Sequence, residues 1–297
     1  LFSEVNGQST SNLVLLDEFG GVLETYDIDA PVRSLEYDEN GFIYVCGDFE
    51  TVQGQSRTSV ARFAESSVTV LDAWQPAVND AVFTCVQDGQ DLLIGGDFTV
   101  VEGMQRSGVA RLHMDGSLVS LFSSNVDGFY VTKPDSNGRV LSLAAGPDDE
   151  LFVGGLFGRI NDEPASALAM VSSISGDVQA TYELERRAEV RSAVTKLADE
   201  SWLIGGQFRR AGNNLRANLL RLLPDGDIDS EWPLHTDGPV RSLKKLIDGS
   251  VIIGGFFGKV SDQRYLSAAR ISDPVQGVLD ENWRPPLIGS VAVVEQD

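Results

Sequence analysis

One short motif recurs five times along this chain of 297 residues. Each copy is an apolar run that ends in Gly-Gly-x-Phe or a close variant of it. The second glycines of the five copies are Gly47, Gly96, Gly155, Gly206 and Gly255, at intervals of 49, 59, 51 and 49 residues. A motif that returns about every fifty residues indicates one supersecondary unit copied along the chain. A unit of this size cannot bury its own apolar faces, so the copies must pack on one another.

Four strands are expected in each unit. The first is a short run such as VRSL at 32–35, and the second is the apolar run that ends in the glycines. We expect the phenylalanine of the motif to pack against the next unit. A third strand follows a tight turn, and a fourth strand follows an Asp-Gly turn and ends on an aromatic residue. The closing aromatic residues are Trp74, Phe122, Tyr182, Trp232 and Trp283.

Two positions after the glycine motif are informative, one in the turn before the third strand and one on that strand. Five residues after the phenylalanine the chain has Gly54, Gly103, Asp162, Asn213 or Asp262. Because Gly, Asn and Asp tolerate a left-handed backbone, a turn with positive φ is expected there. Fifteen residues after the second glycine four copies carry Arg62, Arg111, Arg221 and Arg270, and the third copy carries Met170. We expect these arginines to bond turn carbonyls or a blade carboxylate rather than a ligand.

Repeated four-stranded antiparallel units of about fifty residues are typical of β-propeller blades. The sequence therefore predicts an all-β, six-bladed β-propeller that forms a single domain over residues 1–297. Five blades are expected at about 30–77, 78–125, 138–185, 188–235 and 238–285. The sixth blade would be split between 1–29 and 286–297, because Phe2, Val5, Gly7, Leu15 and Tyr26 fall in register with third and fourth strands and 291–294 resembles a first strand. This blade lacks its second strand within the sequence, and an open arc cut from a longer array is the alternative.

Two long segments resemble a known repeat. Residues 95–122 and 205–232, with their Gly-Gly-x-Phe, arginine, Asp-Gly and aromatic positions, are similar to the delta-60 repeat. The resemblance extends over essentially the whole chain, and it implies a β-propeller repeat of large secreted and surface bacterial proteins. It implies no catalytic motif, because the family shares none. The glycine motif is also similar to Kelch-type and fungal cell-cortex repeats, which fit the Asp-Gly turn and the closing aromatic residue less well.

The charge of the chain limits its partners. It carries 23 basic and 44 acidic residues, a net charge of −21, and 42% of its residues are hydrophobic. A field of this sign repels nucleic acid and anionic membranes. No apolar run reaches the roughly 18 residues of a membrane-spanning helix. The sequence begins at Leu1 without a signal peptide, so we expect an excerpt or a processed form of an extracellular or cell-surface protein.

The two cysteines give no metal-ligand spacing and no dense disulfide framework. Cys46 replaces the first glycine of one motif, and Cys85 stands where other copies have Leu35, Leu143 and Leu243. Both are expected to be small core residues, and a disulfide between them is the less favoured alternative.

No catalytic constellation is recognisable. His113 and His235 are isolated, and no nucleophile elbow, P-loop or dinucleotide fingerprint is present. Asp225, Asp227 and Asp229 alternate in a turn and form a weak calcium candidate, although an Asp-Gly turn explains them equally well. Asp48 and Asp97 share the x position of the motif, but Leu156, Gln207 and Phe256 at the same position argue against a ring of acids.

Arg33, Arg191 and Arg241 are the ligand-binding candidates. They occupy one position of the first, innermost strand, so they are predicted to face the central channel. Three cations near one axis would suit an anion such as an acidic sugar. Ion pairing between blades is the simpler explanation of these residues.

The sequence favours a non-enzymatic extracellular binding or scaffold propeller within a larger surface, adhesive or fibrous protein. The expected partners are other domains or subunits of that assembly and a glycan or protein receptor, with no nucleic acid, no membrane insertion and no cofactor other than a weakly supported calcium ion. A glycan-active enzyme with its site at the channel mouth and a phage-type fibre or receptor-binding module are the alternatives.

Overall fold

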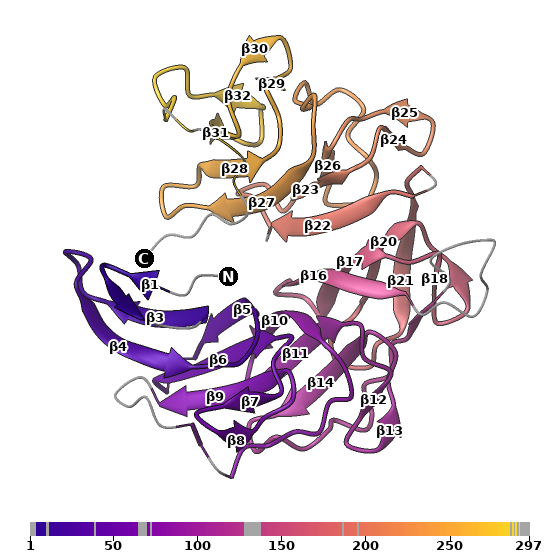
Figure 1. Cartoon of the computed structure of the whole chain (residues 1–297). Helices are drawn as coiled ribbons and strands as arrows, with labels where there is room; N and C mark the ends of the chain where they lie inside the picture. Colours follow the sequence, from indigo (N-terminus) through magenta and orange to yellow (C-terminus); the bar gives the residue numbers. More distant parts are fainter. Residues whose placement is uncertain are drawn as a thin grey trace. The chain divides into compact units, whose positions relative to one another are not determined.

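The structure is a computed structural model that describes residues 4–9, 12–38, 40–64, 70–71, 73–127, 138–185, 187–194, 196–285, 287, 289 and 291. All elements in this part of the chain are strands, which confirms the all-β prediction (Figure 1). The chain divides into two compact units. The first comprises Leu1–Asp127, Asn137–Val140 and Ile174–Gly176, and the second comprises Gly128–Ser136, Leu141–Ser173 and Asp177–Asp297. The predictions of six blades, a closed ring and a single domain stay predictions.

The first unit contains a partial repeat and two further repeats. The partial repeat has β1 (Glu4–Val5), β2 (Gln8–Ser9), β3 (Asn12–Leu16) and β4 (Val22–Asp27). The first repeat has β5 (Val32–Tyr37), β6 (Phe42–Gly47), β7 (Thr51–Val52), β8 (Gln55–Ser56) and β9 (Val60–Ala64). The second has β10 (Val82–Asp88), β11 (Asp91–Gly96), β12 (Val100–Val101), β13 (Met104–Gln105) and β14 (Val109–His113), and β15 (Val126–Asp127) follows it.

The remaining repeats lie mainly in the second unit. The third has β16 (Arg139–Ala145), β17 (Glu150–Leu156), β18 (Arg159–Ile160), β19 (Glu163–Pro164), β20 (Ala167–Ser172) and β21 (Val178–Glu183). The fourth has β22 (Glu189–Val194), β23 (Trp202–Gln207), β24 (Arg210–Ala211), β25 (Asn214–Leu215) and β26 (Leu219–Leu222). The fifth has β27 (Val240–Lys245), β28 (Val251–Gly255), β29 (Lys259–Val260), β30 (Gln263–Arg264), β31 (Ala268–Asp273) and β32 (Val278–Leu279).

Each repeat is built around three antiparallel strands and a small hairpin. The sheets run β5-β6-β9, β10-β11-β14 and β22-β23-β26, and a fourth strand is present in β16-β17-β20-β21 and β27-β28-β31-β32. Among the described residues, the predicted fourth strand is thus present in two repeats, as six residues in β21 and two in β32, and isolated bridges such as Leu222–Ile228 mark it in the first, second and fourth repeats. In the fourth repeat the cause is local. Asp229 Oδ1 accepts hydrogen bonds from the N–H groups of Glu231 and Trp232, and this turn diverts the chain from the sheet.

The second glycine of the motif is required by a close backbone contact. A Cβ atom on Gly96, Gly206 or Gly255 would lie 2.1–2.2 Å from the carbonyl oxygen of the residue just before the first-strand valine that pairs with the glycine. That carbonyl accepts a hydrogen bond from the residue after the glycine, as in Asp97 N–H to Ala81 O at 2.9 Å. Only a residue without Cβ allows the two backbone segments to meet in this way.

A second backbone feature lies twelve residues after this glycine. Ser59, Gly108, Ala167, Asn218 and Ser267 all have φ between 64° and 80°. Each of these residues donates its N–H to the carbonyl of the motif phenylalanine, as in Ser59 to Phe49 at 2.8 Å. The position was not identified from the sequence, because its side chains are too varied to mark a left-handed backbone.

The predicted hairpin turn is confirmed in three repeats. Gly54, Gly103 and Asp162 have positive φ, and so does the residue before each of them. Turns with two such residues match the twist of two-residue β-hairpins. In the fourth and fifth repeats the positive φ lies one residue earlier than predicted, at Gly212 and Ser261.

The hydrophobic core is formed between successive repeats. The motif phenylalanines are buried, and those of the first, second, fourth and fifth repeats cluster with residues of the preceding repeat and not of the next one as expected. Phe98 clusters with Cys46 and Val60 of the first repeat, and Phe257 clusters with Leu203 of the fourth. The closing aromatic residues Trp74 and Trp232 join the cores that their own repeats share with the following ones. Burial across repeats is the reason that one unit is not stable alone.

The N-terminal partial repeat has the predicted register. Asn6 and Gly7 have φ of 51° and 77°, as Gln53 and Gly54 do in the hairpin of the first repeat. Asn12 has φ of 64° at the position of Ser59. Tyr26 is buried against Phe63, with ring centroids 5.1 Å apart. Phe2 and residues 292–294 lie outside the described residues.

Candidate functional site: the bulge and x positions

A β-bulge lies opposite the glycine pair. Val32 pairs with Gly47 and Ser34 pairs with Cys46, so Arg33 is an extra residue in its strand. The same register shift places Phe83, Arg191 and Arg241 in bulges of the second, fourth and fifth repeats. Bulges re-aim side chains and are common next to binding sites. The three predicted ligand-binding arginines are therefore bulge residues, which the sequence alone did not indicate.

The bulge residue lies beside the x residue of the motif in the first repeat. Arg33 donates to Asp48 from Nε at 3.1 and 3.2 Å and from Nη2 at 2.5 Å. The hydrogen bonds that Arg33 donates to Asp48 stabilise the charged guanidinium and raise the pKa of Arg33. Arg33 also lies over the ring of Phe83, the bulge residue of the next repeat, with its central carbon 6.0 Å from the ring centroid. The ion pair is within one repeat, so the expected pairing between blades does not apply to Arg33.

The second repeat adds a partly buried carboxylate to this surface. Asp97 at the x position forms an ion pair of 2.9 Å with Arg139. Burial raises the pKa of Asp97; the charge of Arg139 opposes this shift, and the charges of Asp80 and Asp48 add to it. The side chains of Arg33 and Arg139 are about half exposed, at 47% and 54%. We name Arg33, Asp48, Phe83, Asp97 and Arg139 the first-unit cluster.

The other two candidate arginines lie in the second unit. Arg191 forms an ion pair with Glu189 on the same strand. Arg241 is exposed, and it forms no ion pair with any acidic residue in the part of the chain that the structure describes. Because the three arginines belong to two units that are described separately, their convergence on a channel stays a prediction.

A pocket of about 470 Å³ lies near the glycine motif of the fifth repeat. It is lined by Asp237, Gly238, Pro239, Phe256, Phe257, Gly258 and Ser267. Phe256 occupies the x position and is 65% exposed. Asp237 Oδ1 accepts the N–H groups of Gly258 and Lys259, both at 2.8 Å, so this carboxylate mainly fixes the loop.

The recurring arginines of the third strand have the predicted structural role. Arg111 bonds Asp91 at 2.8 Å and Asp88 at 2.6 Å. Arg221 bonds Ser201 and forms ion pairs with Asp199 and Asp229, and it is buried. Arg62 donates to the carbonyl of Met114 at 2.8 Å, and Arg270 bonds Ser250 at 3.0 Å. A further set, Arg57, Arg106 and Arg216, also bonds backbone carbonyls and was not predicted.

The remaining polar candidates are used in turns. Asp225 accepts the N–H of Asp227 at 3.1 Å, and Asp229 is bound to Arg221. His113 lies 2.9 Å from Asp91. Among the described residues, no three His, Cys, Asp or Glu side chains gather in a group suited to a metal ion. The calcium prediction at Asp225, Asp227 and Asp229 stays a prediction.

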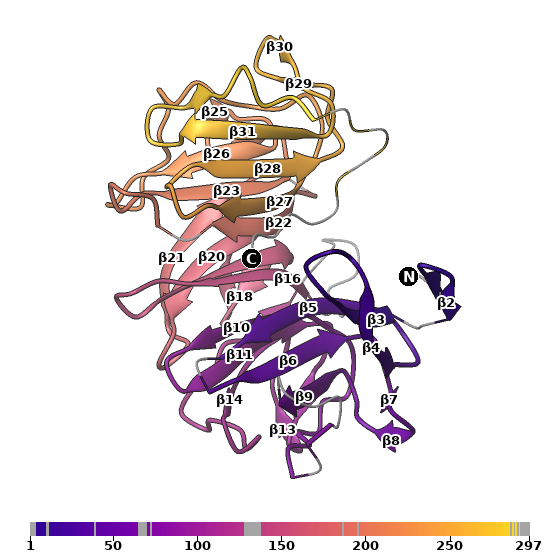
Figure 2. The same ribbon diagram turned by 90° about the vertical axis from the view of Figure 1, so that its left-hand side faces the viewer.

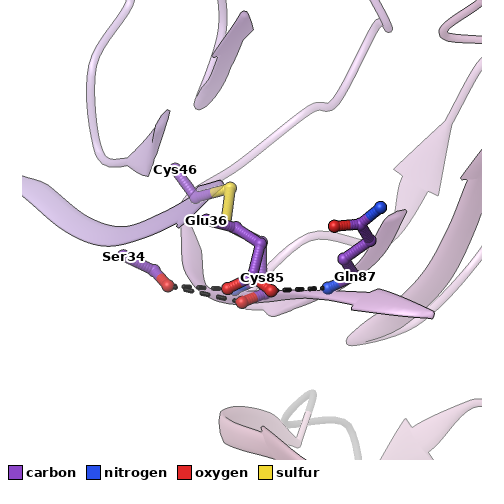
Figure 3. The surroundings of a disulfide bond; sticks show 5 residues. All are labelled: Ser34, Glu36, Cys46, Cys85 and Gln87. Carbon is purple, nitrogen blue, oxygen red and sulfur yellow. Dashed lines mark hydrogen bonds between the residues drawn. A yellow bond between two sulfur atoms is a disulfide. The ribbon is translucent and has the colours of Figure 1, made fainter. Parts of the chain in front are cut away.

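A disulfide joins the first and second repeats (Figure 3). It links Cys46 of β6 to Cys85 of β10, with Cα atoms 6.5 Å apart. The prediction that both cysteines are buried is confirmed, but they are bonded and not independent core residues. Beside the bond, Ser34 Oγ accepts the N–H of Cys85 at 3.3 Å and Glu36 accepts that of Gln87 at 3.1 Å. The pairing was only the less favoured alternative because nothing in one repeat shows which residue of the next repeat faces its first glycine position.

Three segments of the chain match a known family model. Residues 39–67, 91–118 and 197–231 match a family described as "Domain of unknown function (DUF5122) beta-propeller". These segments lie in the first, second and fourth repeats, and the match supports a β-propeller repeat. A comparison with curated proteins gives no significant match.

Solved structures with similar folds are propeller-like and distant in sequence. One is described as the extracellular domain of a hybrid two-component system from B. thetaiotaomicron, with TM-score 0.55, 13% identity, and coverage of 96% of this chain and 35% of that one. Virginiamycin B lyase from Staphylococcus aureus has TM-score 0.52 and 11% identity, over 88% of this chain and 75% of that one. A chain of the mitotic checkpoint complex has TM-score 0.56 and 14% identity, over 93% and 72%. At these identities the likeness concerns the fold alone.

The chain spans 28% and 35% of the lengths of the two similar extracellular domains. In the part of the chain that the structure describes, no helix is long and apolar enough to cross a membrane.

Proposed function

We propose that this chain is a non-enzymatic extracellular binding domain, a propeller-type module of a larger surface protein. The observation that carries the proposal is a constant backbone frame that presents variable side chains. The glycine contact, the bulge and the positive φ recur, while the x position beside them carries Asp48, Asp97, Leu156, Gln207 or Phe256. Loops that vary on a fixed scaffold are typical of recognition surfaces.

The chemistry of the first-unit cluster suits a glycan. Two half-exposed guanidinium groups supply hydrogen-bond donors, and Asp48 and Asp97 supply acceptors. Neighbouring sugar hydroxyls need both donors and acceptors, and the ring of Phe83 offers an apolar face for a sugar ring. Because Arg33 and Arg139 are already paired with carboxylates, we favour a neutral or weakly acidic sugar over the strongly anionic ligand expected from the arginines alone.

The disulfide supports an extracellular location. Such bonds persist in oxidising compartments and are rare in the cytosol. The Cys46–Cys85 bond is buried between two repeats, so it is structural in character. The fold neighbours described as extracellular domains agree with this location.

A glycan-array experiment on the 297-residue chain tests the proposal. We expect binding that falls at least about tenfold in Arg33→Ala and in Phe83→Ala, which corresponds to about 1.4 kcal/mol. Arg210→Ala, an exposed hairpin arginine of β24, is the matched control and should bind normally. Retained binding in both cluster variants would show that the glycan binds outside the first-unit cluster. Absence of binding to any glycan would favour a purely structural scaffold.

A glycan-active enzyme is the second candidate, and one observation favours it. The pKa of Asp97 is raised by burial, with Asp48 and Asp80 adding to the shift, and raised carboxyl pKa values are found in general acids. Incubation of array-positive glycans with the protein, followed by mass spectrometry, separates the two functions. Cleavage products that vanish in Asp97→Asn would replace the binding proposal with the enzymatic one.

A further inference from the structure

The strand β3 of the partial repeat lacks a neighbour that its counterparts have. In the described part of the chain, β3 belongs to a two-stranded sheet with β4 (Figure 1, Figure 2). Its counterparts β9, β14, β20, β26 and β31 each pair along their other edge with the strand that ends in the glycine motif. The partial repeat has no such strand among the described residues.

The side chains of β3 show the consequence. Leu16 is 42% exposed, whereas the residues in register with it are at most 1% exposed; they are Phe63, Leu112, Val171, Leu222 and Ile271. Leu15 is 39% exposed, and Leu23 on β4 is 57% exposed. An apolar edge strand without charged residues is a ready template for another strand.

From these observations we propose that β3 is an acceptor edge for a donor strand from a partner polypeptide segment outside these 297 residues. The donor has the chemistry of the repeat's own second strand, three apolar residues followed by Gly-Gly-x-Phe. Strand addition of this kind gains affinity from main-chain hydrogen bonds and specificity from alternate side chains. The proposal is independent of the recognition surface proposed above.

The five complete repeats define the register of the addition. In the fourth repeat Trp202, Leu203 and Ile204 lie opposite Leu222, Arg221 and Leu220. Counted from the shared positive-φ residue, Asn12 corresponds to Asn218. An incoming strand with this sequence would therefore place its Ile204 opposite Val14 and its Trp202 opposite Leu16.

The same register identifies the main-chain bonds. Gly206 N–H donates to Asn218 O at 3.0 Å, and bonds to one neighbour recur every second residue in an antiparallel pair. The N–H of Ile204 in a donor strand would thus point at β3, and the N–H groups of Val14 and Leu16 would point at the donor. Proline at Ile204 removes one of these bonds and keeps the rest of the peptide unchanged.

Peptide binding to the 297-residue chain tests the proposal. The probe is a synthetic peptide with the sequence of residues 199–209, and the control peptide carries Ile204→Pro. We expect saturable 1:1 binding by isothermal titration calorimetry, at least about tenfold weaker for the proline peptide. Hydrogen exchange at Val14 and Leu16 should slow on binding.

Protein variants locate the edge. Leu16→Glu places a charge where the complete repeats are buried, so it should weaken peptide binding at least about tenfold. Phe19→Glu makes the same kind of change at an 88% exposed turn residue outside β3 and should have no effect. If Leu16→Glu does not fold, the two peptides and the exchange data decide alone. Absent binding, equal binding of both peptides, or concentration-dependent dimers protected at β3 would overturn the proposal, the last in favour of a second copy as the occupant.

Discussion

Two junctions between consecutive repeats differ in one chemical detail. At the junction of the fourth and fifth repeats, Gly205 packs against Val240 and Leu243, and a Cβ on this glycine would lie 3.2 Å from a methyl group of Leu243. At the junction of the first and second repeats, Cys46 and Cys85 occupy the equivalent positions and are bonded. The same hydrogen bond to a serine flanks both contacts: Leu243 N–H donates to Ser192 Oγ at 3.1 Å, and Cys85 N–H donates to Ser34 Oγ at 3.3 Å. The frame brings the two positions together, and the disulfide is an addition to a contact that forms without it.

If the repeats at both junctions share the same backbone geometry, a substitution that disrupts the glycine–carbonyl contact should lower the free energy of unfolding equally in both places. A Cβ on Gly96 or Gly206 would meet a backbone carbonyl oxygen at 2.1 or 2.2 Å. We expect Gly96→Val and Gly206→Val each to lower the free energy of unfolding by at least about 3 kcal/mol, because a backbone segment must move. Urea denaturation of the oxidised protein measures the loss.

Gly249→Ala is the control for both variants. This glycine has φ of 84° and open space around it, so alanine meets strain but no clash. A loss of about 1 kcal/mol is expected. Equal losses in Gly206→Val and Gly249→Ala would show that the carbonyl contact is not what fixes the glycine.

The bonded junction can be converted into the unbonded kind. Cys46→Gly with Cys85→Leu gives the first junction the residues of Gly205 and Leu243. The cysteines are 39 residues apart, and a loop of this length contributes about 2–4 kcal/mol when closed by a disulfide. We expect a loss toward the lower end, because the leucine restores apolar contacts. A double variant as stable as the oxidised wild type would mean that the bond adds nothing to stability.

The contrast between the junctions also explains what the sequence could predict. The repeat, its strands and the structural arginines follow from patterns within one unit, such as the constant spacing of Arg62, Arg111, Arg221 and Arg270. The Cys46–Cys85 bond depends on which residues of neighbouring repeats face each other. That information appears only when Gly205 and Leu243 are seen in contact.

The bulge and the direction of phenylalanine packing were missed for related reasons. Strand alternation alone places Arg33 in a regular strand, whereas the glycine contact forces an extra residue into it. The motif phenylalanine, Phe98 in the second copy, has the same position in every copy. That position does not say whether its side chain packs against the preceding or the next repeat. The sequence therefore predicted which residues belong to the candidate site, but not how the backbone places them.

The unbonded junction should accept a disulfide. Gly205→Cys with Leu243→Cys reproduces the pairing of Cys46 and Cys85 in the fourth and fifth repeats. The expected gain under oxidising conditions is about 1–2 kcal/mol, since loop closure is offset by the loss of the buried Leu243 side chain and by a shift of Val240, whose Cγ1 would lie 2.7 Å from the new Cβ. Thiol titration of the unfolded protein should find no free thiol, and two reactive thiols in that assay, with Cys46 and Cys85 still bonded, would show that the two junctions are not equivalent.

The stability of the regions around the two junctions should also depend differently on pH. This is the smallest of the expected effects. Although burial acts in the opposite direction, hydrogen bonds from Ser201 and the charge of Arg221 lower the pKa of Asp199. A lowered folded-state pKa adds stability at neutral pH, and this stability is lost as the pH falls through that pKa. Asp97 near the first junction has a raised pKa, caused mainly by burial, so its ionised form costs stability at neutral pH and the cost is relieved as the pH falls.

Asp199→Asn should therefore destabilise the protein at neutral pH, with a difference from wild type that shrinks below the ordinary carboxyl pKa of about 3.9. Asp97→Asn should be neutral or stabilising at neutral pH, and its difference should shrink already above that value. Urea midpoints measured from neutral to acidic pH give both profiles. Parallel profiles of the two variants would mean that Asp97 is held in its ionised form by Arg139, and the general-acid interpretation of this residue would then be lost.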